Sequence, residues 1–385
     1  MLDAVRLSPQ AFTRQRTLTF PTLITAMLSG FKASVQAELD AFFAHRANRA
    51  DLRREVSAQA FSKARRNISP SVFSRLNARL LSLVANAGPA PRWRGWRVVA
   101  ADASKLRLFM QADGRRAVRD VTAFALYLPG VEMTLSAELY TDTVGERQML
   151  FEHLHQLNSD DLLVLDRGYP ARWLIAHLSQ QKRAFCVRVD ASGFAVVKTF
   201  LRSGQTEAVV TIPAPDAAEA SDYDCARTPT TVRLVRVLTP NGRVHVLMTS
   251  LLDAQAYPAS DFAALYHSRW RIEEAFKRLK HRLALENTSG LSWRAVQQDF
   301  GAKILADNLH ALTVREAAER DPLPENRKIN RTYAIAHLRR RLPCWLLLGI
   351  PQGPSLQTLL STLRRHLVPF KPGASKPRPE RPKPH

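Results

Sequence analysis

Four polar residues in one 15-residue segment, Tyr266, Arg269, Glu273 and Lys280, have types and a spacing suited to phosphate chemistry. On a helix that turns about 100° per residue, the four side chains fall within about 60° of one another. An apolar stripe runs beside this polar row on the same helix. The stripe consists of Phe262, Leu265, Ile272, Phe276, Leu279 and Leu283. This pattern predicts a helix that is anchored in a core and points one carboxylate, flanked by cations, into a cleft.

Two aspartates follow apolar segments that are typical of buried strands. Asp102 follows residues 98–101, and Asp166 follows residues 162–165. Carboxylates at the ends of neighbouring strands can converge on Mg²⁺, which prefers oxygen ligands. Two such ions, about 4 Å apart, activate an attacking hydroxyl and stabilise the leaving oxygen of a phosphodiester. Glu273 would complete such a site from its helix.

Each of these residues also has an ordinary interpretation. An Asp after a strand is most often a turn or cap residue, and Asp190, which ends the strand expected at residues 187–189, is the most credible substitute. The charged helix could be a solvated face in which Glu273 and Lys277 form an i,i+4 pair. Arg269 could likewise be a structural partner of Glu273.

The charge of the chain indicates a polyanionic partner. Its 385 residues carry 56 Lys and Arg against 34 Asp and Glu, a formal charge of +22. Anionic membrane is the competing partner, but no apolar run approaches the roughly 18 residues of a membrane span. The N-terminus has no apolar signal core, and the three cysteines are sparse, so we expect a reduced, cytoplasmic protein.

The pattern along the chain predicts an α/β protein whose mixed sheet is flanked by helices. Residues 1–88 are expected to be helical and to dock on DNA through their basic surface, although a merely solvated basic surface fits equally well. Strands and helices of a catalytic domain are expected in two segments, 92–202 and 251–320. The other expected parts are a β-strand insertion at 203–250, a C-terminal helical region at 321–368 and a disordered basic tail at 369–385.

The Tyr-x2-Arg-x3-Glu-x6-Lys spacing resembles the signature of the DDE transposases of bacterial insertion sequences, in the family numbered four. The aspartate contexts are similar as well: Asp102-Ala103-Ser104, and Asp166-Arg167-Gly168-Tyr169 after its strand. Residues 60–66 and 248–252 also resemble family segments, and the resemblance extends from about residue 15 to 320. One departure is that no Trp lies between Trp173 and Trp270, where some members carry one that stacks on a flipped base.

The resemblance implies a ribonuclease-H-like fold and an enzyme that cuts and rejoins DNA at terminal inverted repeats by cut-and-paste transposition. Asp102, Asp166 and Glu273 would be catalytic and would hold two Mg²⁺ ions, for which Mn²⁺ may substitute. The residues expected to bind DNA are Tyr266, Arg269 and Lys280 together with Lys63, Arg65 and Arg66 of the N-terminal domain. The implied partners are double-stranded DNA and a second copy of the chain, at the nucleoid. A nuclease or resolvase of the same fold, and a non-enzymatic DNA-binding regulator, are the alternatives.

Overall fold

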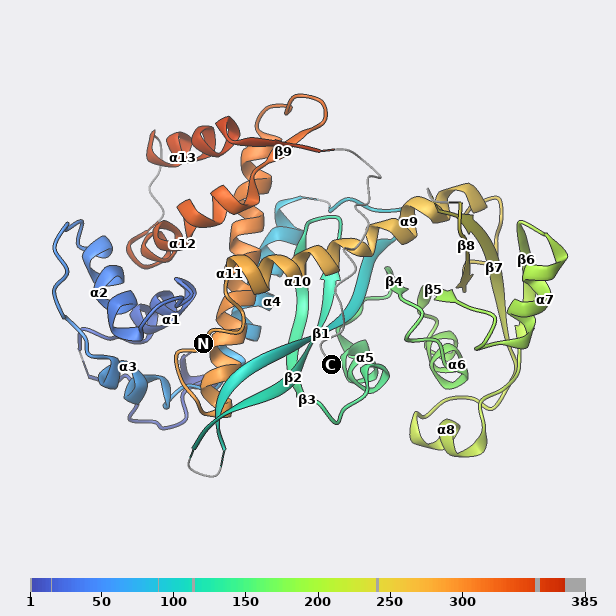
Figure 1. Ribbon diagram of the computed structural model, residues 1–385, viewed down its shortest axis with the longest axis horizontal. Coiled ribbons are helices and arrows are strands. Elements are labelled where there is room, and N and C mark those ends of the chain that lie inside the picture. Colours follow the sequence, from blue (N-terminus) through green and yellow to red (C-terminus); the bar gives the residue numbers. More distant parts are fainter. Residues whose placement is uncertain are drawn as a thin grey trace, which may run out of the picture.

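A single eight-stranded sheet runs through the centre of the computed structural model, which describes residues 2–14, 16–88, 90–112, 115–239, 242–349 and 354–370. The order of the strands is β3-β2-β1-β4-β5-β8-β7-β6 (Figure 1). Their bounds are β1 (Arg97–Ala112), β2 (Arg115–Leu128), β3 (Met133–Thr141), β4 (Asp161–Leu165), β5 (Ala184–Val189), β6 (Glu207–Ile212), β7 (Thr230–Leu238) and β8 (Val244–Thr249).

The first five strands confirm the expected fold class. β2 is antiparallel to both β1 and β3, whereas β1, β4 and β5 are parallel to one another. The order 3-2-1-4-5 with an antiparallel second strand is the ribonuclease-H-like arrangement. β1 is longer than the sequence pattern suggested, because the apolar segment at 98–101 continues through Asp102 to Ala112 as one strand, which β2 pairs from Ala100 onward.

The strand-rich segment at 203–250 extends this sheet. β8 pairs antiparallel with β5, β7 pairs with β8, and β6 forms the outer edge. The insertion expected from the sequence therefore shares the backbone ladder of the central sheet. The helix α7 (Ala195–Ser203) precedes β6, and α8 (Ala217–Asp222) lies between β6 and β7.

Helices cover both faces of the sheet because neighbouring residues of β1 point to opposite sides. Val99 and Ala101 pack in the core formed with α5 (Glu146–His153) and α6 (Arg172–Gln180). Ala100 and Leu106 pack in the opposite core, formed with α10 (Trp270–Arg282) and α11 (Trp293–Glu319). The short helix α9 (Phe262–Ser268) packs over β4, β5, β7 and β8 on this same side.

The N-terminal region is helical, as expected, but it shares its core with helices near the other end of the chain. Phe61 and Phe73 pack with Leu305 of α11 and Cys344 of α12. A smaller cluster joins the last helices and the β9–β10 pair to Ala317. The helices concerned are α1 (Phe20–Leu28), α2 (Val35–Arg46), α3 (Ala58–Arg65), α4 (Ser71–Ala87), α12 (Arg331–Leu348) and α13 (Pro354–Arg365), and the pair is β9 (Arg327–Ile329) with β10 (Leu367–Pro369).

Two further expectations concern a membrane-spanning helix and the basic C-terminal tail. Within the described residues, none of the helices combines the length and the apolar character that crossing a bilayer requires. The basic tail expected at 369–385 lies almost wholly at residues 371–385, which are outside the described residues.

Candidate active site

The register of β1 against β4 brings the two predicted aspartates to the same level of the sheet. Ala100 is the partner of Val164 in this parallel pair, and two further residues along each strand lead to Asp102 and Asp166. Asp166 directly follows β4, as predicted. Asp102 lies inside β1, opposite Ala125 of β2, where the sequence had suggested a strand end. Side chains two residues apart share a face, so both carboxylates project from the edge where β4 stops.

The signature segment forms two helices, α9 and α10, that meet at Arg269. This residue keeps helical dihedrals, φ −55° and ψ −35°, so the chain continues in one direction through the junction (Figure 1). All six members of the predicted apolar stripe are buried, with exposures of 4% or less. The predicted anchoring of this helix is therefore confirmed, and its polar row faces the edge that carries Asp102 and Asp166.

A network of polar contacts joins the signature to Asp166. The Tyr266 hydroxyl donates a 3.0 Å hydrogen bond to Oδ1 of Asp166. Nη2 of Arg269 lies 3.0 Å from Oε1 of Glu273 and 3.9 Å from Oδ2 of Asp166. Arg269 is 2% exposed, and its Nε and Nη1 atoms are buried without a hydrogen-bond partner among the described residues. In this structure Arg269 holds two carboxylates together, which is the structural alternative raised for it from the sequence.

The carboxylates of the site differ in their preference for the charged form. Burial raises the pKa of Asp102 to about 7; the charge of Arg269 opposes this rise, and the carboxylates of Glu273 and Glu146 add to it. Burial also acts on Asp166, but the charge of Arg269, the Arg167 backbone N–H and the Tyr266 hydroxyl outweigh it and lower the pKa of that carboxyl. Arg269 therefore neutralises Asp166 by contact, whereas it reaches Asp102 only through its field.

Glu146 is a fourth carboxylate at this site that sequence reasoning missed. It lies in the first turn of α5, close to Gly168, the second residue after Asp166. The Oε2 atom of Glu146 is 3.8 Å from the point where a Cβ atom on Gly168 would lie. Burial and the nearby Asp166 raise the pKa of Glu146, and Lys105 opposes that rise. Its type and place gave no clear signal, because an acidic residue in the first turn of a helix is more often a favourable partner of the helix dipole.

The donor set suits a hard divalent cation. Within the described residues, no group of three or more His, Cys, Asp or Glu side chains is drawn together closely enough to hold a metal ion as it stands. The candidate donors are nonetheless carboxylate oxygens alone, which Mg²⁺ prefers. Burial is the main cause of the raised pKa of Asp102, and the carboxylates of Glu273 and Glu146 add to it. A bound cation would compensate for both effects, so the residues fit the metal that the resemblance implies.

The other residues expected to bind DNA lie in two different settings. Lys63 and Arg66 are exposed near the end of α3, and Nζ of Lys280 donates a 2.6 Å hydrogen bond to the carbonyl of Lys105. Arg65 is 3% exposed, and its guanidinium forms an ion pair of 2.9 Å with Asp299. Further hydrogen bonds from Arg65 reach Gln298 and the Ala295 carbonyl. The expectation for Arg65 needs correction, because a buried guanidinium so occupied joins α3 to α11 and does not face solvent.

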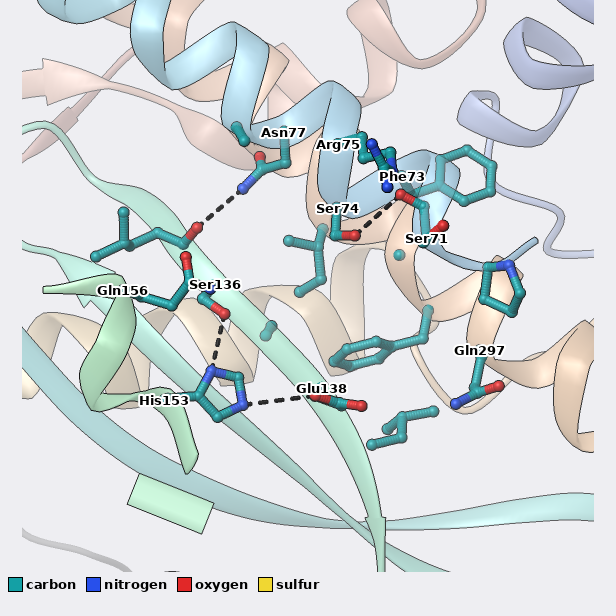
Figure 2. A pocket seen from close by; sticks show the side chains of 18 of the residues that line it. Ser71, Phe73, Ser74, Arg75, Asn77, Ser136, Glu138, His153, Gln156 and Gln297 are labelled. Carbon is teal, nitrogen blue, oxygen red and sulfur yellow. Dashed lines mark hydrogen bonds and ion pairs between the residues drawn. The ribbon is translucent and has the colours of Figure 1, made fainter. Parts of the chain in front are cut away.

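A separate cavity of about 610 Å³ lies away from the carboxylates, between α4, β3, α5 and α11. Figure 2 shows His153 beside Ser136 and Glu138 on one side, and the polar side chains of α4 opposite. His153 is 5% exposed and its Nδ1 atom is 2.9 Å from the Ser136 hydroxyl. Burial lowers the pKa of His153 to about 4, so the ring is neutral at physiological pH. This cavity shares no residue with the carboxylate site.

Comparison with known families agrees with the geometry of the site. The family described as "Transposase DDE domain" matches residues 93–309, more than half of the chain. The chain belongs to this family. The matched range contains Asp102, Asp166 and the whole of the signature helix.

Two similar proteins place this DDE transposase domain in context. The transposase InsG for insertion sequence element IS4 of Escherichia coli (strain K12) is 24% identical over 281 residues. The match covers 69% of this chain and 62% of the relative, so it spans less than two thirds of that protein's length. A cryo-EM structure of a piggyBac transposase synaptic complex with hairpin DNA gives a TM-score of 0.42 at 11% identity, covering 96% of this chain and 82% of that one. That likeness is too weak to support a conclusion about this chain.

Proposed function

We propose that this chain is a transposase that cleaves DNA at the terminal inverted repeats of an insertion sequence and joins the freed ends to a target. The observation that carries the proposal is that Asp166 and Glu273 share one buried arginine and that Asp102 lies at the same level on the neighbouring strand, within a domain of the DDE family. Two Mg²⁺ ions, for which Mn²⁺ may substitute, would supply an activated hydroxyl and stabilise the leaving oxygen when bound.

The residues of the chain divide the remaining work. Arg269 orients the carboxylates of Asp166 and Glu273 by direct contact, and the Tyr266 hydroxyl fixes a rotamer of Asp166. Asp102, fixed in the middle of a paired strand, supplies the third ligand from a rigid position. Such support holds ligands in place before the metal arrives.

The substrate in this proposal is double-stranded DNA. The formal charge of +22 favours a polyanion, and the exposed cations Lys63 and Arg66 of the N-terminal helices would contact phosphates. Lys280, whose Nζ donates to the carbonyl of Lys105, three residues from Asp102, would contact the phosphate backbone near the reacting bond. Because two DNA ends must be held together for joining, we expect a homodimer that forms on DNA.

Cleavage of labelled DNA from either side of the coding sequence, with Mg²⁺ or Mn²⁺, tests the proposal. Glu273→Gln should reduce cleavage by more than about 100-fold, since loss of an outer-shell partner alone typically costs 10–100-fold. Glu274→Gln is the matched control, because Glu274 is the exposed neighbour of Glu273 on the same helix. Equal cleavage by wild type and Glu273→Gln would contradict the proposal.

The same reaction distinguishes the alternative activities. A transposase should join the cleaved 3′ end to a plasmid target, whereas a nuclease or resolvase of the same fold should release ends without joining them to new sites. A non-enzymatic regulator should bind the DNA without cleaving it, whether Mg²⁺ or Mn²⁺ is present. Cleavage without joining would restrict the function to that of a nuclease.

A further inference from the structure

The central hairpin continues beyond the sheet as a two-stranded ribbon. β4 pairs with β1 only over residues 97–100, and β3 pairs with β2 only from residue 121 onward. Residues 105–112 and 115–120, here called the ribbon arm, therefore pair only with each other. Figure 1 shows the arm sweeping from the centre of the sheet toward the lower left of the view, on the side where α3 lies.

The two faces of the ribbon arm have opposite character. On the inner face, Leu106 and Leu108 are buried in the core that contains α10 and α11. On the outer face, Phe109 is 45% exposed and lies directly opposite Val118, which is 52% exposed. The guanidinium of Arg116 lies over the Phe109 ring, 4.2 Å from its centre. The outer face thus presents an apolar centre capped by a cation.

The ribbon arm is strongly basic. Lys105 and Arg107 share the outer face with Arg116, because alternate residues of β1 and their partners on β2 point the same way. The carboxylate on this face, Asp120, lies 3.2 Å from Arg107, and their side chains are 53% and 75% exposed. The described residues of the arm contain five cationic side chains and one carboxylate, that of Asp120. The cations are Lys105, Arg107, Arg115, Arg116 and Arg119.

Contacts along one edge fix the arm relative to the carboxylate site. The Arg107 backbone N–H donates to Glu286 at 2.9 Å, and that of Gln111 donates to the Leu291 carbonyl at 2.9 Å. Lys280, on the helix that carries Glu273, donates to the carbonyl of Lys105 at 2.6 Å. The arm is therefore held in place by the same segment that positions the candidate catalytic glutamate.

The ribbon arm lies between two other features of the molecule. Lys105 lies three residues beyond Asp102, about 10 Å along the strand, and the two side chains point to opposite faces of the sheet. At the far end, Gln111 lines a cavity of about 810 Å³ together with Trp293, Arg294 and Arg66. From Lys105 to Ala112 the arm extends about 23 Å, roughly two thirds of a turn of B-DNA.

We propose that the outer face of the ribbon arm binds double-stranded DNA. The major groove of B-DNA admits a two-stranded β-ribbon, and Arg and Lys neutralise its phosphates. The excess of cations favours this polyanion over a second protein copy docked on Phe109 and Val118. The inference rests on the proposed function, which names DNA as substrate, and adds a binding surface that neither the signature nor the N-terminal helices contain.

Salt-dependent binding to a mixed-sequence duplex of about 30 base pairs, roughly three helical turns, tests the surface in EDTA, where no cleavage can occur. The variant Lys105→Ser/Arg107→Ser/Arg116→Ser should lower affinity by at least about tenfold and reduce the slope of log K against log salt by about 2–3. The control, Lys198→Ser/Arg202→Ser/Arg227→Ser, removes the same charge from exposed cations near β6 and α8. Equal losses in the two variants would overturn the proposal.

A photo-crosslinking residue at position 109 provides a positional readout. It should crosslink to the labelled duplex, and the same residue at Val209, which is 58% exposed on β6, should not. If Phe109→Ser changed the sedimentation of the protein without DNA and left duplex binding intact, the face would be an interface between copies and the proposal would be wrong. Metal-dependent cleavage by the wild type is measured in parallel. If the wild type cleaves DNA and the triple ribbon-arm variant binds the duplex as well as wild type does, the ribbon-arm proposal is wrong and the proposed function stands. If position 109 crosslinks to the duplex but the wild type does not cleave it, the ribbon arm binds DNA and the proposed function is wrong.

Discussion

The Tyr266 hydroxyl reaches across 100 residues of sequence to donate a 3.0 Å hydrogen bond to Oδ1 of Asp166. This bond joins the helix that carries Glu273 to the end of β4, and it helps to lower the pKa of Asp166 against the opposing effect of burial. Two of the proposed metal ligands are therefore positioned by one tyrosine and one arginine.

Tyr266→Phe should weaken metal-dependent cleavage without unfolding the protein. A hydrogen bond to a charged group contributes about 1.5–3 kcal/mol. If the whole of this contribution supports metal binding, cleavage at limiting Mn²⁺ should fall by about 10–100-fold. The loss should appear as a higher Mn²⁺ concentration at half-maximal cleavage. Tyr140→Phe is the control, because Tyr140 donates a comparable bond to Glu152 far from the site. Equal metal requirements in both variants would contradict the positioning role.

Arg269→Met should destabilise the fold as well as the activity. Arg269 is 2% exposed, and its removal takes a cation from beside the partly buried carboxylates of Asp166 and Glu273. Breaking a buried pair costs about 3–5 kcal/mol, and the lower end is expected here because both partners are partly exposed. Urea unfolding measures the loss. The double variant Arg269→Met/Glu273→Gln should lose less than the sum of the single changes. If Arg269→Met lowered only the affinity for DNA and left stability unchanged, Arg269 would instead be a ligand of DNA phosphates.

Asp102→Asn should stabilise the metal-free protein at alkaline pH. The folded-state pKa of about 7 lies above the ordinary 3.8, so ionising Asp102 costs stability as the pH rises from 3.8 through 7. After discounting for partial exposure, a gain of about 1–3 kcal/mol is expected at pH 8 and a smaller one at pH 5. Unfolding in EDTA at the two pH values measures it. Asp190→Asn, at an exposed strand end, is the control. A destabilised Asp102→Asn protein at pH 8 would refute this view of the site.

His153 should make the fold sensitive to acid. Burial lowers its pKa from 6.5 to about 4, so the unfolded chain takes up the proton first as the pH falls. The free energy of unfolding should therefore drop by up to about 1.4 kcal/mol per pH unit between these values and level off below. His153→Gln, which can keep a hydrogen bond to Ser136, should flatten this part of the profile. His155→Gln, at an exposed neighbour, should leave the slope unchanged.

The sequence was most informative where the pattern is local. The apolar stripe from Phe262 to Leu283 depends only on helical spacing, and every member is buried. The common level of Asp102 and Asp166 in the sheet could be expected from two apolar segments that are each followed by an aspartate, provided that the strands are neighbours. That adjacency is a property of the sheet order, and the resemblance to a known family supplied it.

Non-local partners account for what the sequence did not reveal. Arg65 looks like a surface cation in its own segment, and only the fold brings it to Asp299 and Gln298, more than 230 residues away. The first strand was expected to end at Asp102, after its apolar segment at residues 98–101. The strand continues because β2 pairs with it, and its polar side chains then form the outer face of the ribbon arm.

The central claim is that Asp102, Asp166 and Glu273 share a metal ion. Titration with Mn²⁺ tests it most directly, because binding of the ion reduces the electron paramagnetic resonance signal of free Mn²⁺. Wild type should bind Mn²⁺, and Asp102→Asn, Asp166→Asn and Glu273→Gln should each weaken that binding by more than about tenfold while remaining folded. Asp190→Asn and Glu274→Gln should bind as wild type does. Unchanged binding in the first three variants, or an equal loss in the two controls, would show that these carboxylates do not share a metal ion.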